Sequence, residues 1–140
     1  MQSAAEIFEI CIPVLPADID SMQHVNNVAY LRWVQDVAVA HWRHAATPLE
    51  QQQWLWVVVR HEIDYKHAAV LGDEVVAKTW VGSAHGLKFQ RHTELFRSSD
   101  GTLLAKALSI WCPLDAATRR PTPASDDIRR RFSIPESATR

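Results

Sequence analysis

The 140-residue sequence has no excess of charge of either sign, little cysteine and no long apolar run. A net charge of −1 argues against a nucleic-acid-binding protein, which usually carries a basic excess. The two cysteines lie far apart and form no CxxC pair, so we expect buried free thiols in a reducing compartment. The apolar runs are too short to span a bilayer. The N-terminus carries Glu6 and Glu9 without the basic and apolar segments of a secretory signal, so the expected location is the cytoplasm.

Motifs of several enzyme classes are also missing. His41 and His44 would share a helix face, but no third ligand follows at a zinc-site spacing. Ser109 is not part of a G-x-S-x-G elbow, which argues against a Ser/His/Asp hydrolase. The acids Asp18 and Asp20 have neither further oxygen ligands nor a phosphate-binding loop beside them. We therefore expect neither a metal ion nor another cofactor.

What the sequence does contain is enough apolar material for one folded domain. Its length is typical of a single domain, and its apolar fraction of 47% is ordinary for a globular protein. Six tryptophans are unusual, and they suit cores, ligand clefts and subunit interfaces. We expect one domain over residues 1–140, with its core in 6–123 and a C-terminal tail over 124–140.

Hydrophobic periodicity predicts one long helix among strands. Apolar residues recur at three- and four-residue steps from Val28 to Ala46, with Asn27 as the expected N-cap and Thr47-Pro48 as the end. A proline-bounded loop is expected over 17–27, and a single helical turn over 125–131. Segments rich in β-branched and aromatic residues predict strands over 6–12, 54–66, 74–83, 87–97 and 103–114.

This order of elements predicts an α+β fold. Strands joined by short turns must be antiparallel neighbours, and the sheet must wrap around the single long helix to bury its apolar stripe. One helix cannot cover both faces of such a sheet. The remaining strand surface and open edges therefore predict self-association.

The polar segment Asp18–Tyr30, DIDSMQHVNNVAY, is the candidate functional site. A helix start offers unpaired N–H groups and a positive dipole end, both of which stabilise a developing oxyanion. Asp20 lies seven residues before Asn27, so a loop that folds back would bring its carboxylate to the helix start. The alternative is purely structural, with Asp18 and Asp20 forming Asx-turns in the loop.

The same segment carries a resemblance to a known family. The pattern D18-x-D20-x3-H24-V25-N26-N27-x2-Y30 resembles the hotdog-fold acyl-CoA thioesterases, most closely their 4-hydroxybenzoyl-CoA thioesterase and YbgC-like branch. The HVNN-x2-Y string is also similar to that of plant acyl-carrier-protein thioesterases. The likeness continues through segments 63–65, 72–74 and 111–123, and it covers about 110 residues.

The resemblance implies a hotdog fold, in which a curved antiparallel sheet of about five strands wraps a long central helix. It implies a homodimer or homotetramer with a continuous sheet, and an acyl-CoA or acyl-carrier-protein thioester bound at the subunit interface. Asp20 would be the nucleophile or the general base, and the backbone N–H of Asn27 would polarise the carbonyl. His24, Asn26 and Tyr30 would contact the substrate. The acyl group and the thiol carrier stay open.

One departure and two alternatives accompany this interpretation. The family commonly has a glutamate five residues after the helix tyrosine, where this sequence has Gln35 followed by Asp36. A non-catalytic hotdog module that binds acyl-CoA or acyl carrier protein is one alternative. A hotdog hydratase or dehydratase is the other, and it would use His24 together with Asp20.

Overall fold

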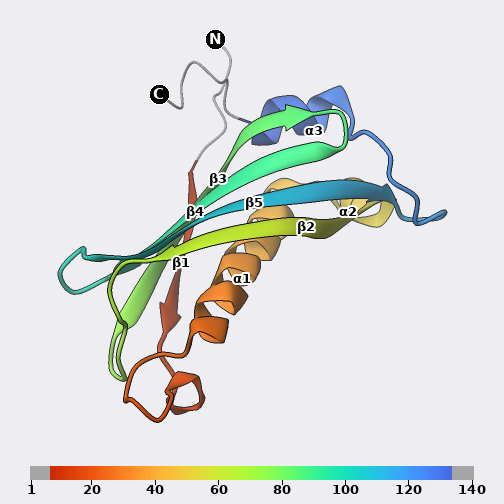
Figure 1. Ribbon diagram of the computed structural model, residues 1–140. Helices are drawn as coiled ribbons and strands as arrows, with labels where there is room; N and C mark the ends of the chain where they lie inside the picture. Colours follow the sequence, from red (N-terminus) through yellow and green to blue (C-terminus); the bar gives the residue numbers. More distant parts are fainter. Residues whose placement is uncertain (1–6, 134–140) are drawn as a thin grey trace.

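The computed structural model describes residues 7–133, which form a curved five-stranded antiparallel sheet wrapped around one long helix (Figure 1). The spatial order of the strands is β1-β3-β4-β5-β2. The bounds of the strands are β1 Phe8–Pro13, β2 Trp54–Tyr65, β3 Glu74–His85, β4 Lys88–Arg97 and β5 Leu103–Asp115. Those of the helices are η1 Pro16–Asp18, α1 Asn27–Ala45, α2 Pro48–Gln53 and α3 Asp126–Phe132. The expected α+β hotdog architecture is confirmed.

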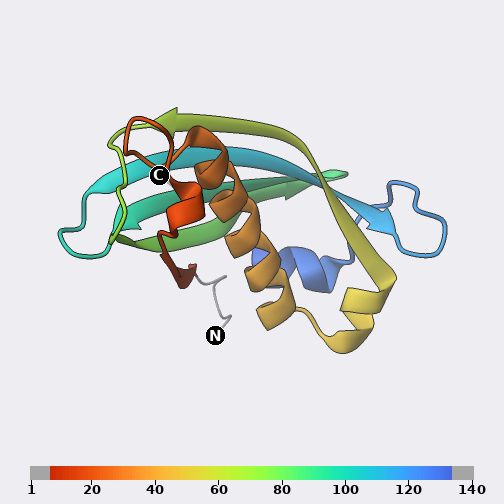
Figure 2. The same ribbon diagram turned by 90° about the horizontal axis from the view of Figure 1, so that it is seen from below.

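Helix α1 lies across the concave face of the sheet (Figure 2), and the side that it buries is apolar except for His41. Its buried residues recur at three- and four-residue steps. The helix begins one position earlier than the sequence suggested. Asn26 is the N-cap, and its side-chain oxygen accepts the Ala29 N–H at 3.1 Å, whereas Asn27 is already helical. The prediction of Asn27 as the cap was therefore wrong.

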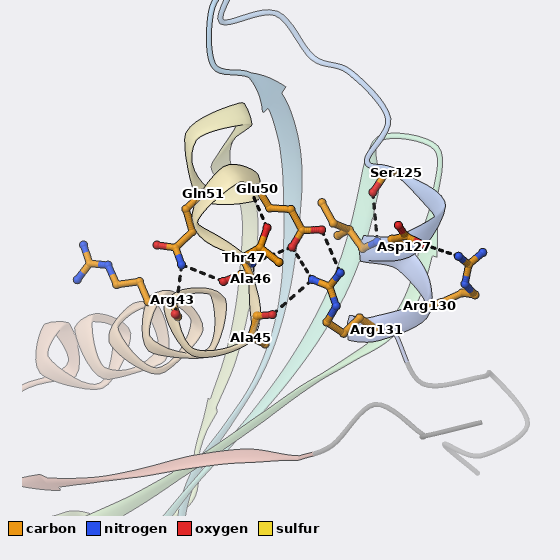
Figure 3. A network of polar contacts seen from close by, with 11 residues as sticks. Arg43, Ala45, Ala46, Thr47, Glu50, Gln51, Ser125, Asp127, Arg130 and Arg131 are labelled. Atoms are coloured by element: carbon orange, nitrogen blue, oxygen red, sulfur yellow. Dashed lines mark hydrogen bonds and ion pairs between the residues drawn. The ribbon is translucent and has the colours of Figure 1, made fainter. Parts of the chain in front are cut away.

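A second helix follows where the sequence predicted only a stop. Thr47 caps α2, Pro48 occupies its first turn, and Glu50 completes a capping box by accepting the Thr47 N–H. Arg131 of α3 binds Glu50 with both terminal nitrogens and also donates to the carbonyl of Ala45 (Figure 3). These contacts hold α2 and α3 against the C-terminal end of α1.

Two hydrophobic clusters fill the space between α1 and the sheet. The first surrounds the N-terminal half of α1 and includes Trp33, Val34 and Leu95. The second surrounds the C-terminal half and includes Ile128 and Phe132 of α3. Hydrophobic packing therefore extends beyond Pro123, into the segment expected to be a tail. Within residues 7–133, no helix is both long and apolar enough to cross a membrane.

The pairing of neighbouring strands shifts register at three places, in β2, in β3 and between β4 and β5 at Leu95/Phe96. In β2, Val58 pairs with Trp111 and Arg60 with Ile110, so Val59 is an extra residue without a partner on β5. In β3 the bulge falls at Gly82, where a Cβ atom would lie 2.8 Å from Nε2 of His92. Only glycine fits there without displacing that ring.

Candidate active site

The loop before α1 folds back on itself as a tight hairpin. Ile19 and Val25 form an isolated antiparallel bridge, and the Asp20 N–H donates to the His24 carbonyl at 2.8 Å. The Asn26 N–H donates to the Asp18 carbonyl at 2.8 Å, which ties the helix cap to the loop. The turn residue Gln23 has φ 66°, the left-handed conformation that such a turn requires. The hairpin therefore brings Asp20 back to the start of α1.

Asp18 holds this loop in place. Its side chain is 3% exposed, and its carboxylate accepts the Leu15 N–H at 2.9 Å and an Arg32 N–H at 2.6 Å. Burial alone would raise the pKa of Asp18, but the hydrogen bonds from Leu15 and Arg32 outweigh burial and lower it. An ionised Asp18 thus anchors the loop to both η1 and α1.

Asp20 combines a structural contact with an unused oxygen. Its Oδ1 accepts the backbone N–H groups of Met22 at 2.9 Å and His24 at 3.3 Å, as in an Asx-turn. Its Oδ2 has no hydrogen-bond donor among residues 7–133, and the residue is only half-buried. The structural and the catalytic interpretations are therefore compatible, because each uses a different oxygen.

The first turn of α1 presents unpaired backbone donors. The Asn26 side chain satisfies the N–H of Ala29. The N–H groups of Asn27 and Val28 have no acceptor in the part of the chain that the structure describes. They lie at the positive end of a 19-residue helix and so favour negative charge.

A pocket of about 230 Å³ joins this helix start to the end of β2, and we call it the Asp20 pocket. The loop and helix contribute Asp20, His24, Val25, Asn27 and Tyr30, whereas the opposite wall is Tyr65, Lys66, His67 and Ala68. Four of the five predicted site residues thus line one pocket, and Asn26 is not among its lining residues. Sequence reasoning missed the opposite wall, although Ile63-Asp64-Tyr65 carried part of the family resemblance.

Tyr30 holds the two walls together. Its hydroxyl accepts the Ala69 N–H at 2.8 Å, and the Val25 N–H donates to the Ala69 carbonyl at 2.9 Å. Burial raises the pKa of Tyr30, against a smaller opposing effect of the hydrogen bond from Ala69. The Tyr65 hydroxyl makes a longer contact of 3.4 Å with the Asn27 carbonyl. The Tyr30 hydroxyl therefore has a structural partner already.

Other side chains that the sequence singled out make no hydrogen bond to the Asp20 carboxylate. The exposed His24 ring makes no hydrogen bond within residues 7–133, so no histidine–Asp20 pair is formed. Gln35 is exposed on α1 and does not line the pocket. Lys66 lines the pocket, whereas the strand residues Arg60, Lys88, Arg91 and Arg97 do not. The described residues contain no group of side chains that could hold a metal ion.

Comparisons with known proteins point to one family. The model of the Thioesterase-like superfamily matches residues 14–132. A chloroplastic palmitoyl-acyl carrier protein thioesterase of Gossypium hirsutum is 26% identical over 121 residues, which cover 80% of this chain and 29% of that protein. The long-chain acyl-CoA thioesterase FadM of Escherichia coli strain K12 is 24% identical over 120 residues, which cover 81% of this chain and 88% of that protein. The chain thus spans less than a third of the length of its plant relatives.

The fold is shared with solved structures of the same family. A thioesterase complexed with coenzyme A and Zn from Thermus thermophilus superposes with a TM-score of 0.77 at 26% identity. The superposition covers 89% of this chain and 90% of that one.

Proposed function

Because the chain belongs to the Thioesterase-like superfamily, we propose that it hydrolyses an acyl thioester in the Asp20 pocket. One observation carries the proposal: a carboxylate with a free Oδ2 and the unpaired N–H of Asn27 belong to the same pocket. Thioester hydrolysis needs these two groups, one to deliver the nucleophile and one to stabilise the oxyanion.

The chemistry has two routes that share the same groups. Oδ2 of Asp20 attacks the carbonyl carbon and expels the thiolate, leaving a mixed anhydride that water then hydrolyses. Alternatively, Oδ2 takes a proton from a water molecule, and that water attacks. In both routes the oxygen of the tetrahedral intermediate faces the N–H of Asn27. Thioester and water become free acid and thiol in both.

The named relatives support a coenzyme A or acyl-carrier-protein thioester as the substrate. FadM is named as a long-chain acyl-CoA thioesterase, and the plant relatives as acyl-carrier-protein thioesterases. Lys66 on the opposite wall of the Asp20 pocket supplies a positive charge near the entering substrate. Such a charge favours a thioester whose carrier bears phosphates.

We also infer that the protein self-associates along β2. This strand is at one end of the sheet, so its outer edge has no partner strand among the described residues. Val57 and Val59 are exposed on it, and an apolar, unpaired edge of this length favours pairing with a second copy. Sedimentation of the purified protein would test this, and a monomer at micromolar concentration would contradict it.

The decisive experiment is Asp20→Asn, assayed by thiol release from a panel of acyl-CoA thioesters. The asparagine keeps an oxygen for the Met22 and His24 N–H groups, so the loop should stay folded. It cannot act as nucleophile or base, and we expect kcat/KM to fall about 10²–10⁴-fold. Asp36→Asn, the same change at an exposed position on α1 outside the pocket, should leave activity unchanged.

Two outcomes would contradict the proposal. Turnover by Asp20→Asn equal to that of the unaltered protein would remove Asp20 from the chemistry. Binding of acyl-CoA without thiol release by the unaltered protein would favour a non-catalytic binding module instead.

A further inference from the structure

A larger cavity, of about 470 Å³, lies at the opposite end of α1 from the Asp20 pocket. Its α1 residues start at Ala38, eleven positions after Asn27, and so about 17 Å along the helix axis. Figure 3 shows α2 and α3 fastened against this end of α1, where Arg43 and Gln51 belong to the cavity lining. Six aromatic side chains line this cavity, which we call the aromatic cavity: Trp42, Trp54, Trp56, Phe89, Trp111 and Phe132.

The cavity also contains a buried cation without a counter-ion. Arg91 of β4 is 8% exposed, and no carboxylate within residues 7–133 pairs with it. Its Nη1 donates to Nδ1 of His41 at 2.9 Å and to Oγ1 of Thr79 at 3.1 Å. Its Nε and Nη2 have no acceptor in the same part of the chain.

Both partners of Arg91 are neutral. Burial, reinforced by the positive charge of Arg91, lowers the pKa of His41 to about 3, so its ring is uncharged at neutral pH. Burial lowers the pKa of Arg91 to about 10, which leaves it protonated. An unpaired buried charge is costly, and native proteins usually pair such a group.

Three further donors in the same walls lack acceptors. The indole N–H groups of Trp54, Trp56 and Trp111 are buried and have no hydrogen-bond partner among the described residues. All three tryptophans line the aromatic cavity. Buried donors are nearly always satisfied in native structures, so unsatisfied donors from three strand positions around one cavity indicate a missing acceptor.

We propose that the aromatic cavity binds an aromatic monocarboxylate, with the carboxylate on Arg91 and the ring among the tryptophans. A carboxylate matches the single buried charge and offers two acceptor oxygens to the free nitrogens of the guanidinium. A phosphate dianion would leave excess negative charge in an apolar site. The exposed Arg43 lines the cavity but does not change the buried charge.

The size of the cavity sets the size of the ligand. A cavity of about 150 Å³ is enough for benzene. The aromatic cavity is about three times larger, which suits a two-ring acid such as 2-naphthoate and leaves room for substituents. Within one chain, the aromatic cavity and the Asp20 pocket share no lining residue.

Calorimetric titration of the full chain with 2-naphthoate and with neutral 2-naphthamide tests the proposal. Both ligands fill the same space, but only the acid forms charged hydrogen bonds with Arg91. We expect the acid to bind about 10- to 100-fold more tightly than the amide. Failure of the acid to bind, or equal affinity for the two ligands, would overturn the proposal, and neither result depends on a variant.

Variants then locate the site. Arg91→Met should abolish the preference for the acid, and Arg91→Lys should keep part of it, since lysine retains the charge but loses the planar fork. Arg60→Met changes an exposed arginine outside the cavity and should bind like the unaltered protein. Asp20→Asn should also leave binding unchanged. A preference that survives Arg91→Met, or disappears in Asp20→Asn, would overturn the assignment.

Discussion

Replacing Tyr30 with phenylalanine tests whether its hydroxyl fastens the two walls of the Asp20 pocket. The substitution removes one oxygen and leaves the ring in its place between Trp33 and Tyr65. The hydroxyl accepts the N–H of Ala69, a residue that is completely buried. Without it, this N–H has no acceptor and cannot reach water.

The expected magnitude follows from that burial. Leaving a buried donor unsatisfied costs about 1–3 kcal/mol of unfolding free energy. For a domain of this size, each 1 kcal/mol lowers the melting temperature by about 4 °C, so we expect a decrease of ~4–12 °C. The amide of Ala69 should also exchange its hydrogen faster, because its local protection depends on this bond.

Tyr65→Phe is the matched control, since these are the two tyrosines of the chain. The Tyr65 side chain is 47% exposed and its hydroxyl contact is 3.4 Å long, so we expect a loss under about 0.5 kcal/mol. Thermal unfolding followed by circular dichroism compares the two variants. Equal melting temperatures for both would refute the role assigned to Tyr30.

Two further predictions concern the other end of α1. The pKa of His41 is lowered to about 3 in the folded protein, so below its usual value near 6.5 the unfolded chain binds a proton that the folded chain does not. The unfolding free energy should therefore fall by up to ~1.4 kcal/mol per pH unit as the pH is lowered from about 6.5 to 4.5. Urea unfolding at a series of pH values measures this, and the free energy of His41→Gln should depend less steeply on pH. Glu50→Gln breaks the ion pair with Arg131 and should cost about 1 kcal/mol. Asp127→Asn, which removes the exposed pair with Arg130, should cost almost nothing; equal losses in both variants would contradict this view of α2 and α3.

Much of the fold could be predicted because elements that bury one face have apolar residues at regular spacings in the sequence. The apolar steps that predicted a helix over 28–46 correspond to α1 Asn27–Ala45, and the predicted strand over 54–66 corresponds to β2 Trp54–Tyr65. Each of these elements packs one face against a cluster, so its side chains repeat with the period of the element.

Positions governed by hydrogen bonds were harder to predict. The choice between Asn26 and Asn27 as the cap depends on the hairpin, because the Asn26 N–H donates to Asp18 and holds Asn26 in an extended conformation. At Thr47-Pro48 the proline was interpreted only as an end. The capping box with Glu50 was the local signal for α2, and it was present in the sequence.

Apart from Tyr65 in the family resemblance, the far wall of the Asp20 pocket had no signal in the sequence that joined it to the loop. Tyr65 and Lys66 line the same pocket as Asn27 because β2 ends beside the start of α1 and because Val25 and Tyr30 both bind Ala69. These contacts join residues about forty positions apart, and neither the spacing nor the polarity of the intervening segment encodes them. The half of the site carried by the loop and helix could therefore be predicted, but the half carried by β2 could not.

The extra residue in β2 allows one strand to serve both ends of the molecule. Before Val59, the even-numbered side chains Trp54, Trp56 and Val58 pack against the second cluster. After it, the odd-numbered Ile63 packs against the first cluster, and the Tyr65 ring contacts Tyr30. If the side chains of β2 alternated between the two faces without this extra residue, either the even-numbered or the odd-numbered set would point away from α1. The extra valine shifts the alternation of side chains by one residue, so that Trp54 and Trp56 of the aromatic cavity and Tyr65 of the Asp20 pocket lie on the same face of the sheet.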